Sequence, residues 1–148
     1  MDKLIELMKR AFADTFAMYL KAHNYHWNVE GPDFFQYHGL FETIYGEVYG
    51  AVDQFAEEIR ALDSYAPGSL RRIAELTNLE DDMTIPTAME MTRKLAEANA
   101  NVLLTLKLTR DAADALGQNG LVNFLEDRLD NHKKHAWFLR AQSKTQVQ

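Results

Sequence analysis

The stretch from His26 to Asp63, HWNVEGPDFFQYHGLFETIYGEVYGAVDQFAEEIRALD, decides the fold. After the turn signal Gly31-Pro32, apolar residues recur at spacings of three and four from about Asp33 to Ser64, which predicts an amphipathic helix. This helix is longer than the average helix of a globular protein. Its apolar stripe consists of Phe41, Ile44, Val48, Val52, Phe55, Ile59 and Leu62.

A second face of this helix carries side chains that can bind metals. On a helical wheel of about 100° per residue with Phe41 at zero, the apolar stripe centres at about 340°. Glu47, Gln54 and Glu58 fall at about 240°, which we interpret as an ordinary solvated side. The potential ligands lie together between about 60° and 160°, away from both of these faces. They are His38, Glu42, Asp53 and Glu57.

The four potential ligands form two pairs. His38 and Glu42 are helical neighbours four residues apart, and so are Asp53 and Glu57. At about 1.5 Å of rise per residue, Glu42 and Asp53 are roughly 16 Å apart along the axis, far beyond a metal–oxygen bond of about 2 Å. If two copies of the helix cross antiparallel about a two-fold axis, His38 and Glu42 of one chain meet Asp53 and Glu57 of the other. The sequence therefore predicts two identical sites per dimer.

The residues around these pairs fit a shared site. His26 ends the preceding helix just before the turn and can fold back towards His38, so it is the natural third ligand. Gly46 and Gly50 lie between the pairs, although each costs a helix about 0.5–1 kcal/mol relative to alanine. Small residues there permit two helices to approach closely. Imidazole and carboxylate ligands without sulfur suit iron, manganese or zinc.

The rest of the chain extends the pattern to four long helices. The other expected elements are a helix from about Lys3 to Trp27, a short helix over Ser69 to Leu76, a helix from Thr84 or Thr87 to about Leu116 that Gly117 and Gly120 stop, and a helix from about Leu121 to Ser143. We therefore expect residues 1–148 to form one all-α domain. Its predicted architecture is a ferritin-like four-helix bundle, with a short extra helix in the long connection between the second and third long helices.

The amino-acid composition excludes several kinds of functional site. The chain has no cysteine, which excludes zinc fingers, iron–sulfur clusters and thiol catalysis. Its net charge of −6 suits cations better than nucleic acid. No apolar run approaches the roughly 20 residues of a membrane span, and the start MDKLIELMKR lacks the order of a signal peptide. We expect a cytoplasmic protein without membrane association.

In the order and spacing of its potential ligands, the sequence resembles the Dps family of mini-ferritins. The family's ligands come in the order His, His, acid, Asp, Glu, and the matching positions here are His26, His38, Glu42, Asp53 and Glu57. Two further segments are similar to that family, YAPGSLRRIAEL at 65–76 to its short crossover helix and HKKHAWFLRA at 132–141 to its last helix. This chain departs from the family at the acid position, where it has Glu42 and many members have Asp.

The resemblance implies a function as well as a fold. It implies a hollow homo-oligomer, a dodecamer, with dinuclear ferroxidase centres at the two-fold interfaces. It implies oxidation of Fe²⁺ by hydrogen peroxide or dioxygen, storage of the ferric mineral, and protection against oxidative damage. By analogy His26, His38 and Glu42 of one chain and Asp53 and Glu57 of its partner are the catalytic residues and iron ligands. Other divalent metals can substitute for iron there.

DNA is a partner that some members of this family bind through a Lys/Arg-rich terminal extension. This chain has almost no extension before its first helix, and the C-terminal tail adds only Lys144 beyond Arg140. An acidic shell repels phosphate. We therefore expect DNA binding to be weak or absent.

Two other functions compete with this interpretation. A ferritin or bacterioferritin with its di-iron site inside one bundle requires Glu-x-x-His motifs, and no Glu in this sequence is followed by His three residues later. A non-enzymatic protein, either a DNA-compacting shell or a helical adaptor that lost its metal, is the alternative of another class. The five ligand positions argue against loss of the metal, and the acidic charge argues against DNA compaction.

Overall fold

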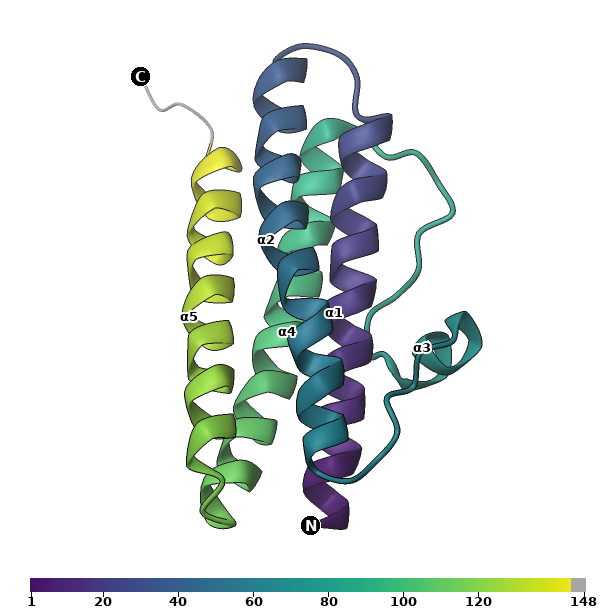
Figure 1. Cartoon of the computed structure of the whole chain (residues 1–148). Coiled ribbons are helices and arrows are strands. Elements are labelled where there is room, and N and C mark those ends of the chain that lie inside the picture. The colour runs from purple at the N-terminus through teal and green to yellow at the C-terminus, as the bar shows by residue number, and fades with distance from the viewer. Residues whose placement is uncertain (145–148) are drawn as a thin grey trace.

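The computed structural model describes residues 1–144, which form four long helices and one short helix (Figure 1). The long helices are α1 (Asp2–Asn28), α2 (Phe34–Ala61), α4 (Ala88–Ala115) and α5 (Asn119–Gln142), and the short helix is α3 (Leu70–Leu76). The last four residues of the C-terminal tail lie outside the described residues. The predicted all-α class and the short helix between the second and third long helices are confirmed.

Helix α1 is central to the packing. It lies antiparallel to α2 and against α4, while α4 pairs with α5 and α3 packs on the side of α1 (Figure 1). Each long helix turns an apolar stripe inward, and full burial of one large apolar side chain contributes about 1.5–3 kcal/mol. The largest fully buried side chains are Leu4, Met8, Met18, Tyr25, Phe41, Ile44, Phe55, Ile59, Met91, Leu95, Leu106 and Leu125. No helix within residues 1–144 is long and apolar enough to cross a membrane.

Capping side chains and glycines decide where the helices begin and end. Thr87, not Thr84, caps α4, because its hydroxyl accepts a hydrogen bond from the backbone N–H of Glu90 at 3.2 Å. Gly117 has a φ of +65° directly after α4, as a helix-terminating glycine should. Gly120 was expected to lie between helices, but it lies in the first turn of α5. In that turn the backbone N–H groups have no helical partners, so glycine interrupts no hydrogen bond there.

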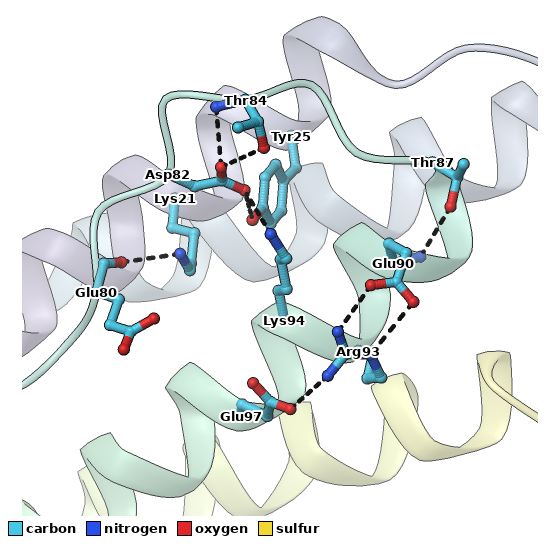
Figure 2. Close-up of polar contacts among 10 residues, drawn as sticks. All are labelled: Lys21, Tyr25, Glu80, Asp82, Thr84, Thr87, Glu90, Arg93, Lys94 and Glu97. Atoms are coloured by element: carbon cyan, nitrogen blue, oxygen red, sulfur yellow. Dashed lines mark hydrogen bonds and ion pairs between the residues drawn. The ribbon is translucent and has the colours of Figure 1, made fainter.

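The long connection between α2 and α4 is fastened to α1 and α4 through the Asp82 carboxylate (Figure 2). The Tyr25 hydroxyl on α1 donates to Asp82 Oδ2 at 2.6 Å, and Lys94 on α4 lies 3.5 Å from the same oxygen. The backbone N–H and the hydroxyl of Thr84 both donate to Oδ1. These hydrogen bonds from Thr84 and Tyr25 hold the pKa of Asp82 well below its ordinary value. The Asp82 carboxylate therefore attaches the connection to Tyr25 near the end of α1 and to Lys94 of α4.

A second carboxylate, Asp14, secures the same connection directly after α3. It is fully buried on α1. The Thr77 hydroxyl and the Asn78 backbone N–H each donate to Oδ1 at 2.7 Å, and the Thr105 hydroxyl of α4 donates to Oδ2 at 2.7 Å. A buried carboxylate is tolerated only when it is fully hydrogen-bonded, so this cluster ties three parts of the chain together at one point.

Candidate metal centre

The end of α1 and the start of α2 bring His26 and His38 together. Their rings are stacked, with centroids 3.7 Å apart and planes inclined by 17°. Nδ1 of His26 lies 2.8 Å from the backbone oxygen of His38, and Nδ1 of His38 lies 2.7 Å from the backbone oxygen of His26. The turn between the two helices therefore closes on a reciprocal pair of hydrogen bonds.

This reciprocal pairing determines which nitrogen of each imidazole can bind a metal. A carbonyl oxygen only accepts hydrogen bonds, so both Nδ1 atoms must be protonated donors. In the neutral rings the lone pair then lies on Nε2, and neither Nε2 has a hydrogen-bond partner among residues 1–144. An Nδ1–H bound to a backbone carbonyl is the usual support of a metal-binding histidine, because it fixes the tautomer and makes Nε2 more basic.

Aromatic rings hold the two imidazoles in place. Phe34 stacks on His38 with a centroid distance of 4.8 Å, and Tyr45 approaches His26 edge-on at 5.1 Å. His26 is buried and His38 is half-buried, whereas Glu42, one helical turn after His38, is exposed. The Glu42 carboxylate makes no ion pair with another of residues 1–144, so it is free to move towards a cation next to the imidazoles.

Asp53 and Glu57 form the other group. Both are exposed and lie on neighbouring turns of α2. A side-chain hydrogen bond with Asp53, reinforced by the negative charge of that residue, raises the pKa of Glu57. Two neighbouring carboxylates repel each other, and a bound cation would remove this repulsion.

The structure does not bring these two groups together within one chain. Within residues 1–144 no three His, Asp or Glu side chains are arranged to hold a common metal ion. The separation of roughly 16 Å along α2 is set by the helix itself, because Glu42 and Asp53 are eleven residues apart. Gly46 and Gly50 lie between the groups with open space around both α-carbons, since an added Cβ would meet nothing within 4 Å.

One polar cluster was missed by the sequence analysis. Glu47 was interpreted as ordinary solvated surface, and this was wrong, because it pairs across the bundle with Arg128 and His135 of α5. Arg128 is bidentate, with Nη2 2.9 Å from Glu47 Oε1, and Nε2 of His135 donates to the same oxygen at 2.8 Å. Burial alone would raise the pKa of Glu47, but the hydrogen bonds from His135 and Arg128 lower it from 4.5 to about 2.

The cluster continues to α4 through a buried histidine. His132 Nδ1 lies 2.8 Å from the side-chain oxygen of Asn99, whose amide donates to the His132 backbone oxygen at 2.8 Å. Burial, and then the charge of Arg128, lowers the pKa of His132 well below its ordinary value, so this ring is neutral. The buried Arg128 guanidinium therefore lies between the Glu47 carboxylate of α2 and His132, which is hydrogen-bonded to Asn99 of α4. Spacing along α5 was the available signal, because Arg128, His132 and His135 share one helical face.

The chain is similar in sequence and in structure to known proteins. The model of the ferritin-like domain family matches residues 5–146. General stress protein 20U of Bacillus subtilis is 31% identical over 95% of this chain and 97% of its own length. The DNA protection during starvation protein of Brevibacillus brevis is 30% identical over 91% of each chain. The crystal structure of a Dps protein from Bacillus brevis superposes with a TM-score of 0.91 and 29% identity, covering 97% of this chain and 96% of that one.

The helical bundle with its crossover connection, together with the domain match, defines a ferritin-like protein. The similarity to Dps proteins extends over nearly the whole chain in both sequence and structure. The chain therefore belongs to the Dps family of the ferritin-like superfamily. Membership of this family implies iron oxidation and storage, with protection against oxidative stress, as the class of function.

Proposed function

We propose that this protein oxidises ferrous iron with hydrogen peroxide, or with dioxygen, at dinuclear sites shared between two copies of the chain. The ferric product is then stored inside a hollow homo-oligomer, a dodecamer by analogy with the family. The observation that carries the proposal is the pair of incomplete ligand groups on α2. The carboxylates of both groups, Glu42, Asp53 and Glu57, are exposed, and within residues 1–144 neither group is joined by further ligands that would complete a dinuclear centre.

In the proposed site His26, His38 and Glu42 of one chain face Asp53 and Glu57 of the partner. An antiparallel crossing of two α2 helices about a two-fold axis generates two such sites. Two features of the single chain support this crossing. Gly46 and Gly50 leave open space midway between the groups, where a second helix would approach. Large apolar side chains are also exposed beside the histidine pair, including Trp27, which is 58% exposed.

The ligand set suits the chemistry of iron oxidation. Imidazole and carboxylate ligands accept both oxidation states of iron, and anionic oxygens favour the ferric ion. Two ferrous ions supply the two electrons that one peroxide requires, so that 2 Fe²⁺ + H₂O₂ + 2 H⁺ gives 2 Fe³⁺ + 2 H₂O. Consuming peroxide in this paired reaction prevents single ferrous ions from cleaving it to hydroxyl radicals. Protection against oxidative damage follows from this stoichiometry.

Mixed assemblies of two inactive variants test the shared site. His38→Ala and Asp53→Ala should each abolish rapid iron oxidation, because each removes a ligand from every site. In a mixed dimer one site carries both substitutions and the other carries neither. Random mixing of equal amounts should therefore restore about one quarter of the wild-type activity.

Gln54→Ala changes the neighbour of Asp53 on another face of α2 and should leave iron oxidation at the wild-type rate. Mass spectrometry of differently labelled chains shows whether mixed dimers form. If mixed dimers form but no activity returns, the site lies within a single chain and the proposal fails. Light scattering that shows a stable monomer would also contradict it.

A further inference from the structure

The last turn of α1 carries the candidate ligand His26, and its position depends on contacts outside the helix. The final carbonyls of a helix have no partners in a following turn, so a helix end frays unless other contacts hold it. At the end of α1 the chain continues in an extended conformation at Val29, whose N–H donates to the Tyr25 backbone oxygen at 2.9 Å. Any further support for this turn must come from other segments of the chain.

The connection between α3 and α4 provides this support along one face of α1. Asp14, Lys21 and Tyr25 lie seven and then four residues apart, so all three share that face. The beginning of the connection donates hydrogen bonds to Asp14. Further along, Lys21 Nζ donates to the backbone oxygen of Glu80 at 2.9 Å. The Tyr25 hydroxyl donates to Asp82 Oδ2 at 2.6 Å (Figure 2). The connection is therefore attached to α1 at three points.

The third attachment fixes the residue directly before His26. The Tyr25 side chain is fully buried. Its partner Asp82 is held in turn, because the backbone N–H and the hydroxyl of Thr84 donate to Oδ1 and the Lys94 ammonium of α4 lies 3.5 Å from Oδ2 (Figure 2). One carboxylate therefore joins the last turn of α1 to the connection and to α4.

A movement of this turn would reach both imidazoles of the histidine pair. The backbone oxygen of His26 accepts the hydrogen bond from Nδ1 of His38 at 2.7 Å, and Nδ1 of His26 donates to the backbone oxygen of His38 at 2.8 Å. A shift of the chain at His26 therefore turns the His38 ring as well. Replacing a residue that orients a metal-binding histidine typically weakens metal binding by about 10- to 100-fold.

We propose that Tyr25 and Asp82 are positioning residues for the candidate metal centre. Their hydrogen bond holds His26 and His38 in the orientation in which the two imidazoles bind ferrous iron, and neither Tyr25 nor Asp82 touches the ion. This role rests on the proposed function and extends it to residues that act only through the backbone of α1. Because Tyr25 lies one step further from the metal than the groups bonded to the imidazoles, loss of its hydroxyl should weaken iron binding by about tenfold, the lower end of that range.

Tyr25→Phe tests this role, because it removes the hydroxyl and keeps the buried ring. Tyr37→Phe is the matched control. Tyr37 is also buried and directly precedes the other histidine of the pair. Its ring packs on Phe41 with centroids 6.2 Å apart, as that of Tyr25 does at 6.1 Å. The Tyr37 hydroxyl, however, makes no side-chain hydrogen bond to another of residues 1–144, so its loss should leave the histidine pair in place.

Two measurements on the whole assembled protein report the affinity of the site. With excess peroxide, the ferrous-iron concentration for half-maximal oxidation should rise about tenfold in Tyr25→Phe. The maximal rate should stay at the wild-type value, because the ligands of the filled site are unchanged. Calorimetric titration with Co²⁺ in the absence of peroxide should show the same loss of affinity, since imidazole and carboxylate ligands also bind this ion. Tyr37→Phe should match the wild type in both measurements.

Hydrogen exchange of the metal-free protein reports on the attachment itself. Backbone amides at the end of α1 should exchange faster in Tyr25→Phe, whereas those in the middle of α1 should exchange at the wild-type rate. This pattern distinguishes local loosening from a general loss of stability. Asp82→Ala should act like Tyr25→Phe. The double variant should bind Co²⁺ no more weakly than Asp82→Ala alone, because both changes remove the same hydrogen bond.

An unchanged Co²⁺ affinity in Tyr25→Phe would overturn the proposal, as would an equal loss in Tyr37→Phe or losses that multiply in the double variant. Exchange that accelerates throughout α1 would show a general destabilisation and would overturn it as well. A wild type that neither oxidises iron nor binds Co²⁺ would instead remove the proposed function, while exchange at the end of α1 would still show whether Tyr25 holds this turn.

Discussion

Replacing Glu47 with glutamine should destabilise the protein, because it leaves the buried Arg128 guanidinium without a counter-charge. The Arg128 side chain is only 3% exposed, while that of Glu47 is 30% exposed. The substitution keeps the shape of the side chain and one acceptor oxygen, so it tests the charge and not the volume. An unpaired buried charge is far more costly than the pair it came from.

The pKa of Glu47 sets the magnitude. Hydrogen bonds from His135 and Arg128 overcome the opposing effect of burial and lower this pKa from 4.5 to about 2. At about 1.4 kcal/mol for each tenfold change in the ionisation constant, this drop corresponds to about 3 kcal/mol of stability at neutral pH. Solvent screens the exposed part of the carboxylate, so we expect Glu47→Gln to lose about 2–3 kcal/mol of unfolding free energy at pH 7.

The pH dependence follows from the sign of this shift. The carboxylate binds protons more weakly in the folded chain, so its contribution is complete above pH 4.5 and is lost as the pH falls towards 2. By pH 3 about 2 kcal/mol of the contribution should be gone. The wild type and Glu47→Gln should therefore converge in stability on acidification. Urea unfolding at equal protein concentrations measures the difference, since oligomer stability depends on concentration.

Glu58→Gln is the matched control, because it makes the same chemical change on the same helix at a residue with no ion pair to another of residues 1–144. It should shift the unfolding free energy by less than about 0.5 kcal/mol. A loss below about 0.5 kcal/mol for Glu47→Gln at pH 7 would contradict the reasoning. So would a difference from the wild type that stays constant between pH 7 and pH 3.

Two further predictions concern the crossover connection and DNA. Asp14→Ala should lower the unfolding free energy by about 3 kcal/mol, because it removes the buried carboxylate to which Thr77, Asn78 and Thr105 donate hydrogen bonds. Urea titration beside the exposed control Asp127→Ala checks this. The purified protein should not retard duplex DNA at about 150 mM salt without free divalent metal, because each chain carries a net charge of −6; tight retardation in a gel-shift series would refute it.

The sequence by itself determined the class of fold and the faces of α2. Apolar spacing along a helix is a local property, so the stripe around Phe41 and Ile44 could be predicted without knowledge of any other helix. The same holds for the grouping of His38 with Glu42 and of Asp53 with Glu57, because neighbours four residues apart on a helix always share a face. Their union with a second chain stays a prediction derived from that spacing.

Local rules were less decisive where two candidates were equivalent in sequence. Thr84 and Thr87 both suit a helix start, and the structure selects Thr87 because Thr84 is engaged by Asp82, a carboxylate that Tyr25 and Lys94 hold in place. Gly120 carries the signature of a helix end, yet α5 begins before it. Such choices depend on hydrogen bonds between segments that are distant in the chain, which no local pattern contains.

Only the tertiary structure decided the chemical environment of individual polar side chains. The reciprocal hydrogen bonds of His26 and His38 follow from the path of the turn, and they leave Nε2 of each ring as the potential metal ligand. Glu47 was predicted to be solvated because its wheel position faces away from the α2 core. It is instead paired with Arg128, 81 residues further along the chain. A helical wheel describes one helix alone, whereas the free energy of a charge depends on which helix packs against it.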